Sequence, residues 1–136
     1  MSWINHTLSK WLYAIPFTIF GLFHFLSPEM LIEAVPKFLP GAIFWIYLTG
    51  AALILAGISI ISGKFINLAC KLLAVMLLVF VFTVSLPGII GGNEMMMQAL
   101  LKDLSLAGAA LFIGGQFETE QIVKRTSKVE TSNTNL

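Results

Sequence analysis

Charged residues are unevenly spaced along the chain, and the intervals between them are long and apolar. The three longest intervals contain no aspartate, glutamate, lysine or arginine and cover residues 11–28, 38–63 and 72–93. A shorter fourth interval, 104–117, follows an apolar segment, and only Lys102 and Asp103 interrupt the combined stretch. A transmembrane helix needs about 20 mainly apolar residues to cross about 30 Å of hydrocarbon. The pattern therefore predicts four membrane-spanning helices, near residues 10–26, 42–61, 68–86 and 99–117.

Composition supports this interpretation and excludes several classes of protein. The 136 residues are 57% hydrophobic and 11% charged, whereas an average soluble domain is about 25% charged. A small soluble domain has too much surface for its volume to cover such an apolar core. The net charge of +1 and the lack of a dense basic patch argue against nucleic-acid binding. A single cysteine, Cys70, excludes an intrachain disulfide, a CxxC pair and a cysteine-built metal site.

Proline and glycine mark the expected boundaries of the helices. Ser27-Pro28-Glu29 is typical of a helix start, and predicts a short interfacial helix between the first and second spans. Pro87-Gly88 is expected to end the third span. A polar segment rich in serine and threonine follows the fourth. These signals predict an all-α, four-helix membrane domain over residues 1–117 and a disordered cytoplasmic tail over 118–136.

The distribution of basic residues predicts the orientation. Six of the eight lysines and arginines lie in the N-terminal segment, the middle connection or the C-terminal tail: Lys10, Lys64, Lys71, Lys124, Arg125 and Lys128. Lys37 and Lys102 lie on the other side. The positive-inside rule therefore places both termini in the cytoplasm.

Two stripes of small residues are candidates for close helix packing. Ala52, Ala56, Ser59 and Gly63 share one face of the second span, and Ala107, Ala110 and Gly114 share one face of the fourth. Small side chains let helix backbones approach each other in lipid. Packing within the bundle is the expected role, and the alternative is a contact between two copies of the chain.

Candidate chemistry gathers on the outward side of the predicted bundle. His24 is an ionisable residue in a predicted span, and such residues are functional candidates. Gly21 precedes it by one turn and is expected to leave room beside the imidazole. Asp103 begins the fourth span at a similar depth. The structural alternatives are a helix-end histidine and an aspartate at a helix N-terminus. The full set of candidate ligand-binding residues is His24, Gly21, Asp103, Lys102, Glu29 and Trp45.

A metal or haem site is not expected. The second histidine, His6, is predicted to lie on the opposite side of the membrane from His24, and no histidine or carboxylate spacing matches a metal-binding motif. The chain also lacks a dinucleotide fingerprint. Redox chemistry carried out by its own side chains is therefore not expected.

Several short motifs resemble the DoxX-like family of small four-helix membrane proteins. They are Gly21-Leu22-Phe23-His24-Phe25, Pro28, Val35-Pro36, Leu39-Pro40, Trp45, Gly50, Pro87 and the run from Leu101 to Leu111. The resemblance covers about residues 11–115, and implies a four-helix bundle in a bacterial cell (inner) membrane. Two positions depart from the family pattern. Ala51 and Ala52 stand where members often carry a glutamate, and Asp103 stands where many have an asparagine.

Two functions follow as expectations. The first is a small membrane subunit or accessory protein of a redox or respiratory system, with a quinone or lipid-like ligand bound in the outer half of the bundle. The second is a non-catalytic scaffold or assembly factor for a membrane partner. The expected partners are the lipid bilayer, a membrane redox protein or a second copy of the chain.

Overall fold

The computed structural model describes residues 2–134, with side chains from residue 4 onward, and its regular structure is entirely helical. The elements are α1 (Ser2–Leu26), α2 (Glu29–Ile32), α3 (Ala42–Ser62), α4 (Ile66–Phe80), the π-helical turn η1 (Val81–Ser85), α5 (Leu86–Ile90) and α6 (Met95–Thr134). The all-α prediction is confirmed. A short helix does lie between the first two long ones, although it is a single turn without a side-chain cap.

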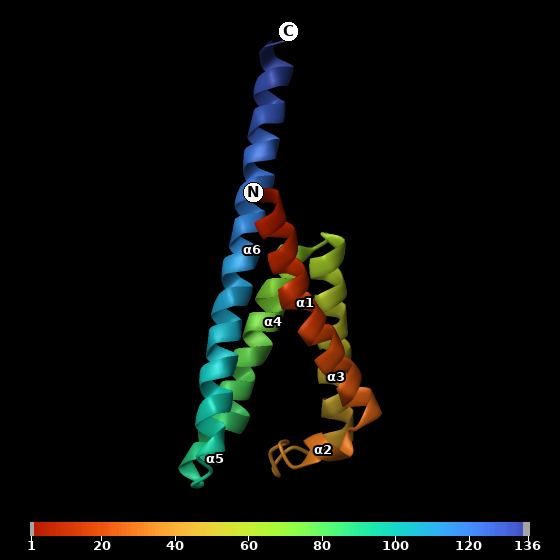
Figure 1. Ribbon diagram of the computed structural model, residues 1–136, viewed down its shortest axis with the longest axis vertical. Helices are drawn as coiled ribbons and strands as arrows, with labels where there is room; N and C mark the ends of the chain where they lie inside the picture. Colours follow the sequence, from red (N-terminus) through yellow and green to blue (C-terminus); the bar gives the residue numbers. More distant parts are fainter. Residues whose placement is uncertain (1, 135–136) are drawn as a thin grey trace.

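The long helices form two pairs that run up and down (Figure 1). Helix α1 packs mainly against α3, and α4 packs mainly against α6. The N-terminus, the α3–α4 connection and the exposed part of α6 lie toward one end of the bundle. The pairs diverge toward the other end, where α2 and α5 lie. This divergence separates the pairs at the end that carries the candidate site.

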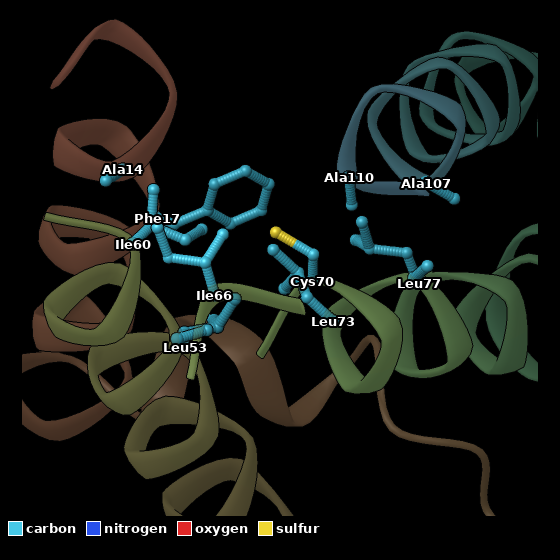
Figure 2. Packing of buried hydrophobic residues seen from close by; sticks show 12 residues of the cluster. Ala14, Phe17, Leu53, Ile60, Ile66, Cys70, Leu73, Leu77, Ala107 and Ala110 are labelled. Atoms are coloured by element: carbon cyan, nitrogen blue, oxygen red, sulfur yellow. The ribbon is translucent and has the colours of Figure 1, made fainter. Parts of the chain in front are cut away.

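A cluster of buried apolar residues joins the two pairs. Figure 2 shows Phe17 reaching from α1 toward Cys70 of α4, with Ala107 and Ala110 of α6 on the far side of α4. Alanines are prominent among the buried residues, whereas large side chains such as Leu55, Leu72 and Phe112 are 62–69% exposed. Soluble domains bury such residues. A small-residue interior beneath a large apolar surface suits packing in lipid.

Glycines set the distance between α1 and α3. A Cβ atom built on Gly50 would lie 2.6 Å from the Cβ of His24 and 3.0 Å from the carbonyl oxygen of Gly21. The expected role of the small-residue stripe on the second span, packing within the bundle, is wrong for most of its members, whereas a contact between two copies of the chain stays a prediction. Of its members only Ala56 is buried, and the packed face instead contains Gly50, Leu53, Ala56, Gly57 and Ile60. The stripe missed this face because it followed small side chains alone, whereas the contact alternates glycine with large residues.

The small-residue stripe on α6 is confirmed. Ala107, Ala110 and Gly114 are its buried residues. A Cβ atom built on Gly114 would lie 3.0 Å from the Cβ of Cys70, so this position brings the backbones of α4 and α6 close together. These residues pack within one copy of the chain.

Pro87 does not end the third span, contrary to the sequence prediction. The helix continues from Ile66 to Ile90 through η1, and the amide of Leu86 donates to the carbonyl of Val81 five residues earlier. In an α-helix the Pro87 ring would clash with the carbonyl four residues before it. The wider π turn relieves that clash. The connection to α6 is consequently short, at residues 91–94, whereas the predicted spans 68–86 and 99–117 left residues 87–98 between them.

The expected disordered tail is instead the last part of α6, which runs for 40 residues. Residues 121–134 are exposed along their whole length. One local interaction that stabilises such an exposed helix is the order of its charges: Glu120 precedes Lys124 by four residues, which is favourable.

Among the residues that the structure describes, three helical segments are long and apolar enough to cross a membrane: Ala42–Ser62, Ile66–Ile90 and Met95–Thr134. Helix α1 has 25 residues, or about 37 Å at 1.5 Å per residue. Its length suffices, but Lys10, Pro16 and His24 lower its mean hydropathy.

Candidate functional site

A half-open cavity of about 820 Å³ lies between the two helix pairs, at the end where they diverge. Its wall is formed by the C-terminal half of α1, the connection that contains α2, the first half of α3, the end of α4 with η1, and the first three turns of α6. Ligand pockets occupy about 300–1,000 Å³ and are mostly apolar with a few polar groups. The volume and lining of this cavity match that description.

His24 is a buried polar residue on the cavity wall, with 5% of its surface exposed. Its Nδ1 lies 2.8 Å from the carbonyl oxygen of Phe20, and the Phe20 ring meets the imidazole edge-on at 4.8 Å. A carbonyl oxygen only accepts hydrogen bonds, so Nδ1 carries the proton. Gly50 lies against the Cβ of His24 and prevents the side chain from moving toward α3. These contacts hold the ring in one orientation.

Asp103 and Lys102 line the same cavity from α6. The Lys102 Nζ lies 3.7 Å from the Asp103 Oδ1, and the aspartate side chain is 14% exposed whereas the lysine is 62% exposed. The carboxylate is therefore the less exposed member of the pair. Both side chains line the cavity, so the pair contributes a carboxylate and a partly exposed ammonium group to its wall.

Trp45 also lines the cavity, and its indole Nε1 donates to the carbonyl oxygen of Pro40 at 3.2 Å. This bond links α3 to the connection that covers the site. The topology thus brings four candidate residues, His24, Asp103, Lys102 and Trp45, to one cavity.

The other two candidates lie elsewhere. A Cβ atom on Gly21 would lie 2.8 Å from the carbonyl oxygen of Gly50 and 2.8 Å from Cγ1 of Ile54. The expected space beside Gly21 is therefore occupied by α3, and this glycine packs helices. Glu29 is exposed on α2 and is not part of the cavity wall.

Sequence inspection did not single out four polar residues of the wall: Tyr13, Thr49, Thr83 and Ser85. Tyr13 donates its hydroxyl hydrogen to the carbonyl oxygen of Leu106 at 2.7 Å, which ties α1 to α6. Thr83 donates to the carbonyl oxygen of Val79 at 2.7 Å. Thr83 and Ser85 belong to η1, and π-helical turns occur frequently at functional sites. The Pro87 that forces this turn was the available signal.

The arrangement is suited to binding. Within residues 4–134, no group of three histidine, cysteine or acidic side chains could hold a metal ion. His6 lies at the opposite end of the bundle, where its Nε2 is 3.8 Å from the Glu120 carboxylate. The cavity offers a large apolar volume with one imidazole, one carboxylate, one ammonium group, one indole and several hydroxyls on its wall.

A family model described as "Domain of unknown function (DUF8561)" matches residues 13–98, more than half of the chain, and the chain therefore belongs to this family. The matched segment includes His24, Trp45 and η1, but ends before Lys102 and Asp103. No curated protein and no solved structure matches the chain.

Proposed function

We propose that this family member is an integral membrane protein of four spanning helices that binds a lipid-like ligand of the quinone class between its helix pairs. Both termini lie in the cytoplasm, and the protein serves as a subunit or accessory protein of a redox or respiratory system. The proposal agrees with the resemblance to DoxX-like proteins in the GxxHF-x2-P element around His24. The observation that supports it most directly is the 820 Å³ cavity with a buried histidine on its wall.

Four spans are proposed because α1 packs closely against α3, which is itself long and apolar enough to cross a membrane. The two helices meet at backbone distance through Gly21 and Gly50, and α1 exposes large apolar side chains such as Leu12 and Phe23. A helix in close contact with a spanning helix and with an apolar outer face belongs in the same hydrocarbon layer. The excess of lysine and arginine at the end that holds both termini supports the cytoplasmic orientation.

A bound ligand, rather than a catalytic reaction, is proposed because the wall residues are tied to the protein. Nδ1 of His24, the Tyr13 hydroxyl and the Trp45 indole each have a backbone partner. Such fixed groups favour one ligand orientation without the cost of ordering them on binding. The apolar remainder of the wall would hold a hydrocarbon tail.

The test is the lipid content of the purified protein. The full chain would be purified in a mild detergent from cells that make quinones, and the extracted molecules would be identified by mass spectrometry. We expect a near-stoichiometric quinone or quinone-like lipid in the wild type and a reduced amount in His24→Ala. Glu118→Ala is the matched control, because Glu118 pairs with Lys71 at 3.6 Å outside the cavity.

Thermal melting of each variant separates binding from folding. A loss of ligand from folded His24→Ala supports the proposal. An unaltered ligand content per folded molecule, together with a lower melting temperature, would give His24 a packing role only. A wild type that copurifies with bulk phospholipid alone would leave the scaffold function as the better explanation.

A further inference from the structure

We infer that the cavity selects a ligand whose head group donates hydrogen bonds, namely an apolar molecule that ends in a hydroxyl group rather than a carbonyl group. This inference rests on the proposed ligand-binding function, and adds the chemistry of the head group to it. It follows from a comparison of the hydrogen-bond donors and acceptors that the wall leaves free.

Four donors on the wall already have acceptors within the protein. Nδ1 of His24 donates to Phe20, and the indole Nε1 of Trp45 donates to Pro40. The remaining two are the hydroxyl hydrogens of Tyr13 and Thr83, whose acceptors are backbone carbonyls. A hydroxyl has a single hydrogen to donate, so neither of these groups has one left for a ligand.

Acceptors on the wall remain free. With Nδ1 protonated, Nε2 of a neutral His24 presents a lone pair, and it has no hydrogen-bond partner among residues 4–134. The Asp103 carboxylate has two oxygens, of which only Oδ1 is within 4 Å of the Lys102 ammonium group. The Tyr13 and Thr83 oxygens also keep lone pairs after donating.

The remaining donors on the wall are the Lys102 ammonium group and the hydroxyls of Thr49 and Ser85. The Lys102 side chain is 62% exposed, and its Nζ lies 3.7 Å from the Asp103 Oδ1, so the ammonium group is directed partly to solvent and partly to the carboxylate. Thr49 and Ser85 carry hydroxyls that can donate or accept. An occupant with a carbonyl head can accept from Ser85 or Thr49, but it leaves Nε2 of His24 and the free Asp103 oxygen without a donor. A hydroxyl head can donate to Nε2 of His24 or to Asp103 and still accept from Ser85 or Thr49.

For the quinone class, this favours the reduced quinol over the oxidised quinone. The two forms share one ring and one tail, and therefore the same apolar contacts, but differ in two hydroxyl hydrogens. A net hydrogen bond contributes about 0.5–1.5 kcal/mol, which corresponds to about a 2- to 12-fold change in affinity per bond at 1.4 kcal/mol per factor of ten. Selectivity on this scale is measurable.

The experiment compares three probes on the wild-type chain in phosphatidylcholine nanodiscs under anaerobic, reducing or oxidising conditions as each probe requires. The probes are a decyl-substituted benzoquinol, the matching benzoquinone and the quinol dimethyl ether, which keeps the ring oxygens but cannot donate. We expect the quinol to bind at least several-fold more tightly than both other probes. Equal affinity for all three, or tighter binding of the quinone, would overturn the inference but leave a ligand-binding protein. Binding of none of them would instead count against the proposed function.

Two variants locate the selectivity. His24→Phe keeps a ring of similar size against Phe20 and Gly50 but removes the acceptor, so we expect the preference for quinol over dimethyl ether to fall. His24→Gln supplies an amide oxygen and is expected to retain part of the preference. Because the comparison of probes uses the wild type, misfolding of either variant does not prevent the test.

Discussion

Replacement of Gly50 by alanine should loosen the contact between α1 and α3. The added methyl group would lie 2.6 Å from the Cβ of His24 and 3.0 Å from the backbone oxygen of Gly21. Neither atom is the free end of a flexible side chain, so the helices must separate. Overpacking of this kind costs about 1–3 kcal/mol.

A matched control is available on α6. Gly108 is exposed, and a Cβ atom built on it would meet nothing within 4 Å. Replacing glycine by alanine inside a helix gains about 0.5–1 kcal/mol from backbone entropy. This gain is common to both sites. The difference in unfolding free energy between Gly108→Ala and Gly50→Ala is therefore the overpacking cost itself, about 1–3 kcal/mol.

The assay is reversible unfolding in mixed micelles with increasing sodium dodecyl sulfate, followed by far-ultraviolet circular dichroism. We expect Gly108→Ala to unfold at or above the wild-type midpoint and Gly50→Ala below it. A Gly50→Ala variant as stable as Gly108→Ala would show that α1 and α3 do not meet at backbone distance, and would refute the close packing argued here.

Three further outcomes are expected. Ala56→Leu should lower the melting temperature more than Leu55→Ala, because Ala56 is buried and Leu55 is 64% exposed. Overpacking costs about 1–3 kcal/mol, whereas surface changes usually stay within about 0.5 kcal/mol. The reverse ranking of the two melting temperatures would contradict the assigned faces of α3. A C-terminal reporter that is active only in the cytoplasm should be active when fused to the full chain, and a reporter that works only outside it should be silent; the opposite pattern would overturn the proposed orientation. A chain that ends at Ile122 should keep the wild-type melting temperature, because residues 123–134 are exposed throughout, and should lose helical circular-dichroism signal. An unchanged helical signal would show that this part of α6 is not helical in solution.

Much of the fold was predictable because charge is costly in hydrocarbon. The charge-free intervals predicted three helix boundaries to within a few residues, namely the end of α1 at Leu26 and the two ends of α3 at Ala42 and Ser62. The errors occurred where local signals have two meanings. Pro87 is a usual helix terminator, but a π turn accommodates it. The polar residues after Glu118 are compatible with a disordered tail and with an exposed helix, and composition does not distinguish the two.

The site was partly predictable for a related reason. His24 and Asp103 stand out because ionisable residues are rare in apolar segments. Hydroxyl residues such as Thr49 and Ser85 are common in membrane helices, so nothing in the pattern marks them as cavity residues. Gly21 was misassigned because a missing side chain indicates either open space or close contact. Only the position of Gly50 decides between these alternatives.

The uninterrupted length of α6 determines how anything attached beyond it is presented. Glu120 pairs with His6, and the segment Gln121–Thr134 is exposed after that contact. As a helix this segment extends about 20 Å at 1.5 Å per residue. A flexible peptide of the same length has a similar average reach, about 5–6 Å times the square root of its residue number, but it points in every direction. The helix therefore acts as a rigid spacer rather than a flexible linker. It fixes both the distance from the bundle and the direction of a group joined to its end.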